Sequence, residues 1–249
     1  MYRNLRPGPI VETIATLVDR IAERFPDSGL RRVATEVLEV AEGSRERVEQ
    51  IGRPIYPLRI AVWGLTLAVI VFLAAVVVQL RLSGEEFSDL GFFLQVMEAG
   101  LNDIILIGAA LAFLMTVEVR VKRRRALKAL HELRSLAHVI DMHQLTKDPE
   151  RLLRLGEDTA SSPPQLLTPF ELGRYLDYCS ELLAILSKIA ALYAERFDDS
   201  VALAAIDEIE ALTNGLSRKI WQKMMVLSTF APPGRGETVV QEVARKVDS

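Results

Sequence analysis

Residues 60–80 read IAVWGLTLAVIVFLAAVVVQL, and this stretch decides the fold. None of its residues is charged, and its only strongly polar residue, Gln79, lies at the end. As a helix rising 1.5 Å per residue it is about 31 Å long, which matches the hydrocarbon core of a bilayer. A helix that is apolar on every face over this length is typical of a membrane span, so the sequence predicts a first transmembrane helix over 57–80.

The flanks of this stretch agree with that prediction. Trp63 and Arg59 lie near its start, where an aromatic anchor and a snorkelling cation are expected at a membrane interface. Pro54 and Pro57 mark its entry.

A second apolar stretch follows, but its uncharged run, IILIGAALAFLMTV over 104–117, is short for a span. Extending the helix to 99–119 brings in Asn102, Asp103 and Glu118 close to the two interfaces. At the bilayer centre Asp103 would cost about 2.5–3.5 kcal/mol, so we expect it at the outer edge. The two stretches together predict a transmembrane hairpin.

The distribution of charge predicts the orientation of the hairpin. Basic residues flank both spans on the side away from the connecting loop 81–98. In that loop, every charged residue after Arg81 is acidic. They are Arg45, Arg47, Arg53 and Arg59 before the first span, and Arg120, Lys122, Arg123, Arg124, Arg125 and Lys128 after the second. The positive-inside rule then places the chain in the plasma (inner) membrane as a multi-pass protein with both termini in the cytoplasm.

The loop 81–98 is expected to hold a short amphipathic helix of its own on the outer membrane surface. Ser83 and Glu86 have the spacing of a capping box. Apolar residues then recur at helical intervals, at Phe87, Leu90, Leu94 and Met97. The alternative is a helix that is continuous with the second span and strongly tilted.

The remaining segments read as cytoplasmic helices. Residues 1–56 predict a pair of amphipathic helices, the first beginning at Pro9, separated by Pro-Asp-Ser-Gly at 26–29. Within 120–230 the second span continues as one long helix to about Leu145, with a seam at Leu130, Leu133, Ala137, Ile140 and Gln144. Asp148-Pro149-Glu150 starts a short helix to about Leu155.

A linker at 156–168 precedes two further helices. The first begins at a capping box with proline, Thr168-Pro169-Phe170-Glu171, and the second begins at Asp198-Asp199-Ser200. The tail 231–249 is expected to be mobile. Fold class is therefore all-α: an integral membrane protein with a two-helix transmembrane hairpin and a cytoplasmic helical bundle.

Three histidines, His131, His138 and His143, fall within one short stretch. His131 and His138 lie two turns apart on one face of a helix, and His138 is three residues from Asp141. Ligands two turns apart cannot converge on one ion without a second helix. A metal site at His131, His138 and Asp141 is thus the weaker interpretation, and a histidine–carboxylate pair beside a packing seam is the stronger one.

Two charged clusters border the membrane. The basic residues Arg120, Lys122, Arg123, Arg124, Arg125 and Lys128 can bind anionic lipid headgroups on the cytoplasmic side, or they can serve only to set the topology. Glu98, Asn102 and Asp103 could form an acidic ring at the outer mouth of a pore if several copies assembled. The alternative for these three is a helix end at the interface of a protein without a pore.

The rest of the composition excludes several classes of function. The net charge of −3 gives no basic field for nucleic acid. Cys179 is the single cysteine, so neither an intramolecular disulfide nor a cysteine zinc site can form, and its position on an apolar stripe predicts a core residue. We find no phosphate loop, nucleophile elbow or H-E-x-x-H motif and expect no cofactor.

These features favour a non-enzymatic, membrane-anchored helical protein that acts as an assembly or interaction module, as a homo-oligomer or with a membrane-protein partner. The alternative is an oligomeric cation pore or membrane-perturbing effector with acidic residues at its outer mouth. A metal-dependent enzyme is the least favoured alternative.

Overall fold

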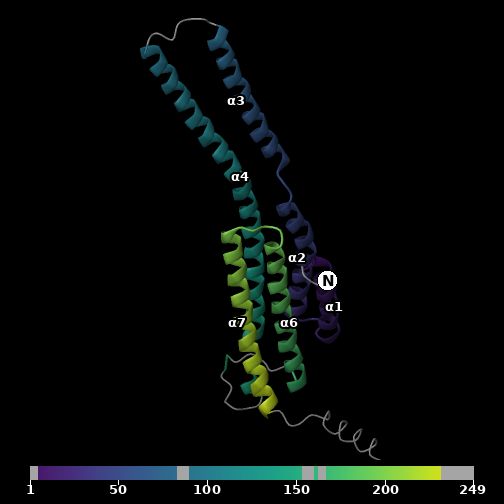
Figure 1. Cartoon of the computed structure of the whole chain (residues 1–249). Helices are drawn as coiled ribbons and strands as arrows, with labels where there is room; N and C mark the ends of the chain where they lie inside the picture. The colour runs from purple at the N-terminus through teal and green to yellow at the C-terminus, as the bar shows by residue number, and fades with distance from the viewer. Residues whose placement is uncertain (1–4, 83–89, 153–159, 162–166, 231–249) are drawn as a thin grey trace, which may run out of the picture. The chain divides into compact units, whose positions relative to one another are not determined.

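The computed structural model describes residues 5–82, 90–152, 160–161 and 167–230, and all regular structure in these residues is helical (Figure 1). This confirms the all-α class for the described residues. The helices are, in chain order, α1 (Pro7–Arg24), α2 (Gly29–Gly52), α3 (Tyr56–Leu82), α4 (Leu90–Leu145), α5 (Pro149–Leu152), α6 (Pro169–Ala194) and α7 (Ser200–Phe230).

The chain divides into two compact units. One, here called the bundle unit, combines Met1–Glu49 with Leu127–Ser249, and the other, here called the hairpin unit, is Gln50–Ala126. The N-terminal helices therefore pack with helices from the far end of the chain rather than forming a unit of their own. Along the sequence, the hairpin unit interrupts the bundle unit between Glu49 and Leu127.

The bundle unit has a continuous apolar core because each of its helices carries an apolar stripe at helical spacing. The predicted seam of α4 is buried at every position, Gln144 included. Thirteen of the 26 residues of α6 are buried. The largest side chains sealed in this core are Ile14, Leu17, Ile21, Leu30, Leu130, Leu133, Ile140, Leu172, Leu176, Leu182, Leu183 and Leu186.

Local signals fix where the last two long helices begin. The Thr168 hydroxyl accepts a hydrogen bond from the Glu171 amide at 3.2 Å, and the Glu171 carboxylate accepts one from the Thr168 amide at 2.8 Å, so the predicted capping box is present. At the start of α7, the Asp199 carboxylate accepts from the amides of Val201 at 3.2 Å and Ala202 at 3.1 Å. Each cap satisfies donors that the first helical turn leaves free.

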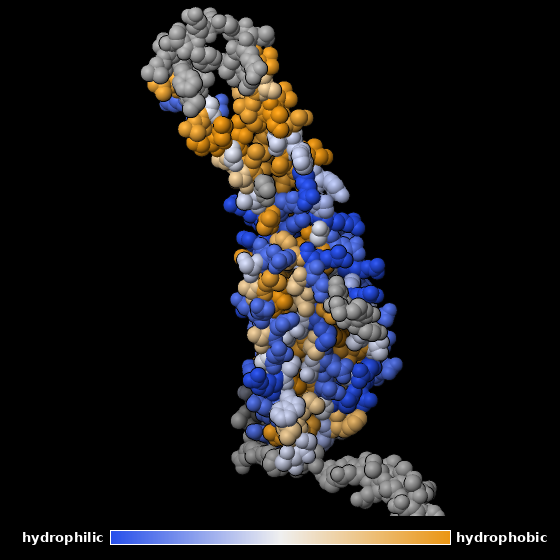
Figure 2. Space-filling model, viewed as in Figure 1, coloured by the Kyte–Doolittle hydropathy of each residue, from blue (hydrophilic) through white to orange (hydrophobic). Residues whose placement is uncertain are grey.

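The hairpin unit holds two helices that are long and apolar enough to cross a membrane. In each, the most apolar 18-residue stretch is entirely unburied within the chain. Figure 2 shows hydrophobic side chains covering the described parts of α3 and the apolar stretch of α4. Large side chains that a soluble protein would bury are exposed here, among them Ile60, Trp63, Phe72, Ile104, Leu106 and Phe113.

The structure differs from the sequence-based prediction in the segment that connects the two apolar helices. Helix α4 begins at Leu90, so residues 90–98 belong to the helix of the second span and not to a separate surface helix. This is the continuous alternative, and it follows from the low cost of extending an existing helix compared with starting a new one. Residues 83–89, with the expected cap at Ser83 and Glu86, lie outside the described residues.

Several boundaries also differ by a few residues. Helix α1 begins at Pro7 rather than Pro9, since both prolines fit the first turn, and α3 continues to Leu82. Helix α4 ends at Leu145, as predicted. Most of the linker 156–168 and the whole tail 231–249 lie outside the described residues.

Candidate interaction surfaces

The best-defined polar site of the hairpin unit is centred on the carboxylate of Glu118, which receives donors from three residues. The Lys122 ammonium lies 2.9 Å from Glu118 Oε1, and the backbone amide of Ile55 donates to the same oxygen at 3.4 Å. Arg59 Nε lies 3.4 Å from Glu118 Oε2. The side chains of Glu118 and Lys122 are only 16% and 14% exposed, so this pair is largely withdrawn from solvent.

The local sequence explains this arrangement. Ile55 precedes α3, and its carbonyl accepts from the amides of Leu58 and Arg59, so its own amide is one of the donors that a helix start leaves free. Glu118 satisfies that donor from α4, while Lys122 follows it by one helical turn. The Glu118 site therefore ties the start of α3 to the far end of the second apolar stretch. Sequence reasoning missed this site, because nothing local pairs Glu118 with residues so distant in the chain.

The structure divides the predicted set of basic residues into two groups. Lys122 is bound to Glu118 and, like Arg123, is only partly exposed. The others, Arg120, Arg124, Arg125 and Lys128, have exposed side chains on α4. The six residues are therefore not equally available to a partner.

The three polar residues predicted for an outer mouth, Glu98, Asn102 and Asp103, all lie on α4 with exposed side chains. Glu98 and Asn102 are one helical turn apart and share a face. The structure gives their positions on one chain, whereas a ring needs several copies.

The histidine stretch does not assemble a metal site. His131 and His138 are exposed on α4, and Asp141 accepts a hydrogen bond from the Gln144 side-chain amide at 2.6 Å. Among the described residues, no group of three His, Cys, Asp or Glu side chains is placed to hold a metal ion. The weak candidates His131, His138 and Asp141 therefore gain no support from the geometry.

His143, which sequence reasoning left without a role, lies at the contact between α4 and the start of α2. Its ring packs so closely on Gly29 that a Cβ at that position would overlap it. Burial, together with the neighbouring cations Arg32 and Lys147, lowers the pKa of His143. The structure therefore favours the neutral imidazole at this contact.

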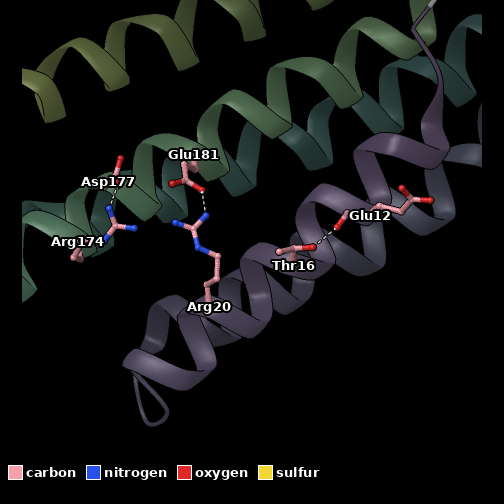
Figure 3. Close-up of polar contacts among 6 residues, drawn as sticks. All are labelled: Glu12, Thr16, Arg20, Arg174, Asp177 and Glu181. Carbon is pink, nitrogen blue, oxygen red and sulfur yellow. Dashed lines mark hydrogen bonds and ion pairs between the residues drawn. The ribbon is translucent and has the colours of Figure 1, made fainter.

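The bundle unit holds α1 against α6 through a polar and aromatic cluster. Figure 3 draws its charged members, Arg20, Glu181, Arg174 and Asp177. The Arg20 guanidinium lies 3.1 Å from the Glu181 carboxylate and 5.2 Å from the ring centre of Tyr178. Arg174 lies 5.1 Å from the same ring and pairs with Asp177 at 2.6 Å. Cations over an aromatic face add to the packing of α1, so the N-terminal helix is a fixed part of the bundle unit.

Two more ion pairs join distant segments of the bundle unit. Arg47 of α2 meets Glu132 of α4 at 2.5 Å, and Arg134 of α4 meets Glu208 of α7 at 3.0 Å. These partners are 85 and 74 residues apart in the chain, so no local spacing in the sequence could predict the pairs. Both pairs are well exposed and so contribute orientation more than stability.

The end of α4 is closed by Lys223 of α7. Its ammonium donates to the backbone carbonyl of Gln144 at 2.8 Å, which also accepts from the Lys147 amide, and to the carbonyl of Lys147, just past the helix end, at 3.1 Å. Burial lowers the pKa of Lys223.

Nearby Cys179 is fully buried, as predicted, and burial raises the pKa of its thiol to about 12, so it behaves as a small apolar core residue.

An exposed apolar pair stands out on the surface of α7. Trp221 is 60% exposed and Met225, one turn further along, is 46% exposed.

Comparison with known proteins gives no further guidance to these surfaces: no family model, curated protein or solved structure matches the chain.

Proposed function

We propose that the chain is a non-enzymatic, membrane-anchored helical protein whose bundle unit acts as an assembly module. The hairpin unit is the anchor, and the bundle unit carries the surface through which copies of the chain associate.

The observation that supports this proposal is the exposure of the two long apolar helices. No residue in their most apolar stretches is buried within the described chain, and such large exposed apolar surfaces suit contact with lipid or with another protein. The bundle unit is built from both flanks of the hairpin unit, and this supports a topology in which both flanks lie on one side of the bilayer. The basic residues beside the spans favour the cytoplasmic side of the plasma (inner) membrane.

The association surface that fits this role is the exposed pair Trp221 and Met225 on α7. A large aromatic and a flexible methionine are enriched where proteins bind one another. Confinement to a bilayer raises the effective concentration of such surfaces, so modest contacts are enough for assembly.

The test is energy transfer between donor- and acceptor-labelled full-length chains reconstituted in liposomes at decreasing protein-to-lipid ratio. We expect transfer above the value that random proximity gives, and a loss of at least half of that excess for the double variant Trp221→Ser with Met225→Gln. Val201→Ser is the matched control, because Val201 is an exposed apolar residue at the other end of α7, 43% exposed.

Only random transfer from the intact chain at every ratio would show a monomer and remove the assembly role. Equal losses for the Trp221/Met225 variant and the Val201 control would keep assembly but move the surface elsewhere.

The second candidate is an oligomeric cation pore, supported by the exposed positions of Glu98, Asn102 and Asp103 on α4. Acidic side chains beside an apolar helix are costly unless they meet water or other copies. Cation flux into liposomes that falls with Asp103→Asn and Glu98→Gln would favour the pore, and no flux from the intact protein would eliminate it.

A further inference from the structure

The hairpin unit is poor in acids where its two helices meet the flanking segments. Between residues 50 and 84 the sequence has no acid, and between 104 and 131 it has only Glu118. That one carboxylate already receives Lys122 and Arg59. The exposed side chains of Arg120, Arg124 and Arg125 therefore form a second, separate group of charges, here called the arginine patch.

The position of the arginine patch along α4 fits one kind of partner. The predicted second span, 99–119, ends just before Arg120, and a helix rise of 1.5 Å per residue places Arg120 to Arg125 within about 9 Å of that end. A bilayer has a headgroup layer roughly 5–8 Å thick on each side of its hydrocarbon core. If the predicted span fills the core, Arg120 and Arg124 lie at the depth of the lipid phosphates, and the long side chain of Arg125 reaches back to that depth.

We propose that Arg120, Arg124 and Arg125 bind the phosphates of anionic lipids, and that Glu118 keeps Lys122, which is only 14% exposed, out of this surface by pairing with it. The inference rests on the proposed function, since it needs the hairpin unit to span a membrane. Guanidinium groups suit the partner because their donors match phosphate oxygens in pairs.

The proposal predicts different effects for basic residues that a simple count of positive charges would treat as equal. Removing one arginine of the patch should weaken the binding of anionic lipid by roughly fivefold, the usual effect of one basic residue near a charged membrane surface. Removing Lys122 should change binding less than twofold, because its charge is already matched by Glu118. Glu118→Gln should strengthen binding, because it releases Lys122 and removes a negative charge beside the patch.

The experiment titrates acyl-labelled phosphatidylglycerol into the full chain in neutral detergent micelles and follows fluorescence anisotropy. The deciding comparison is Arg124→Gln against Lys122→Gln, two cations on the same helix that differ in their partner. Acyl-labelled phosphatidylcholine is the lipid control. Free glycerol phosphate is added as a competitor, to separate a lipid surface from a site for soluble phosphates.

We expect salt-sensitive binding of phosphatidylglycerol, a fivefold loss for Arg124→Gln, little change for Lys122→Gln and a gain for Glu118→Gln. Equal losses for the two single variants, or full competition by glycerol phosphate at equal concentration, would overturn the inference. If Glu118→Gln fails to fold, the comparison of Lys122 with Arg124 still decides.

Failure here can be told apart from failure of the proposed function. Loss of lipid selectivity in a chain that still resists extraction from membranes by alkaline carbonate overturns only the arginine patch. A chain that carbonate extracts would have no membrane anchor, and the proposed function would fail with it.

Discussion

Lys223 shows how one side chain can hold the end of a helix. Its ammonium donates to two carbonyls at the end of α4, and hydrogen bonds from charged donors contribute about 1.5–3 kcal/mol each at most sites. We expect Lys223→Met to lower the free energy of unfolding by about 2 kcal/mol, because both carbonyls lose a charged donor. Urea titration of the full chain in detergent, followed by circular dichroism, measures this.

Lys219 provides the control for that prediction. It lies one turn before Lys223 on α7 and its side chain is exposed, so Lys219→Met should change stability by less than about 0.5 kcal/mol. Equal losses for the two lysine variants would mean that net charge, and not the cap, stabilises this end of the bundle unit.

His143 makes the stability of the bundle unit depend on pH. Its pKa is lowered in the folded chain, so the unfolded chain binds the proton more readily. The stabilisation is complete above about pH 6.5, the ordinary histidine value, and is lost as the pH falls from there through the folded pKa.

We therefore expect His143→Gln to reduce the drop in melting temperature between pH 7.5 and pH 5. His138→Gln serves as the control, because His138 is exposed on the same helix. A His143 variant that loses as much stability on acidification as the unaltered chain would contradict this role.

At the scale of elements, capping side chains that can be recognised in the sequence determine where helices begin. Asp199 caps α7 through the amides of Val201 and Ala202, and it is only 6% exposed. Asp199→Ala should cost about 1–2 kcal/mol of stability. The neighbouring, exposed Asp198 changed to Ala should cost little, and thermal unfolding by circular dichroism compares the two.

Conservative substitution sharpens that comparison. Asp199→Asn keeps an oxygen that can accept from the same amides, so it should retain most of the stability. If Asn destabilises as much as Ala, the charge of Asp199 matters rather than its capping geometry.

At the scale of the whole molecule, the insertion of the hairpin unit into the bundle unit predicts the topology. Single cysteines at Asp27 and Asp207, both exposed and both in the bundle unit, should react with a membrane-impermeant maleimide from the same side. A cysteine at Ser88, in the connecting segment, should react from the opposite side. Labelling in right-side-out and inverted vesicles gives the answer.

The native Cys179 does not have to be replaced for this labelling experiment. It is fully buried and its thiol pKa is raised to about 12, so it should not react while the chain is folded. Labelling of Asp27→Cys and Asp207→Cys from opposite sides would be incompatible with a hairpin inserted into one folded unit.

By itself the sequence determined most of the helices, the two candidate spans, the capping box at Thr168, the start of the last helix within 198–200 and the buried seam of α4. These depend on local spacing and on the length of apolar runs, which a single chain displays directly. Only the tertiary structure decided that Arg20 meets Glu181, that Arg59 and Lys122 share Glu118, and that the N-terminal helices join the bundle unit. The chain offers many acids and bases, and which of them meet depends on how the apolar stripes of distant helices pack together.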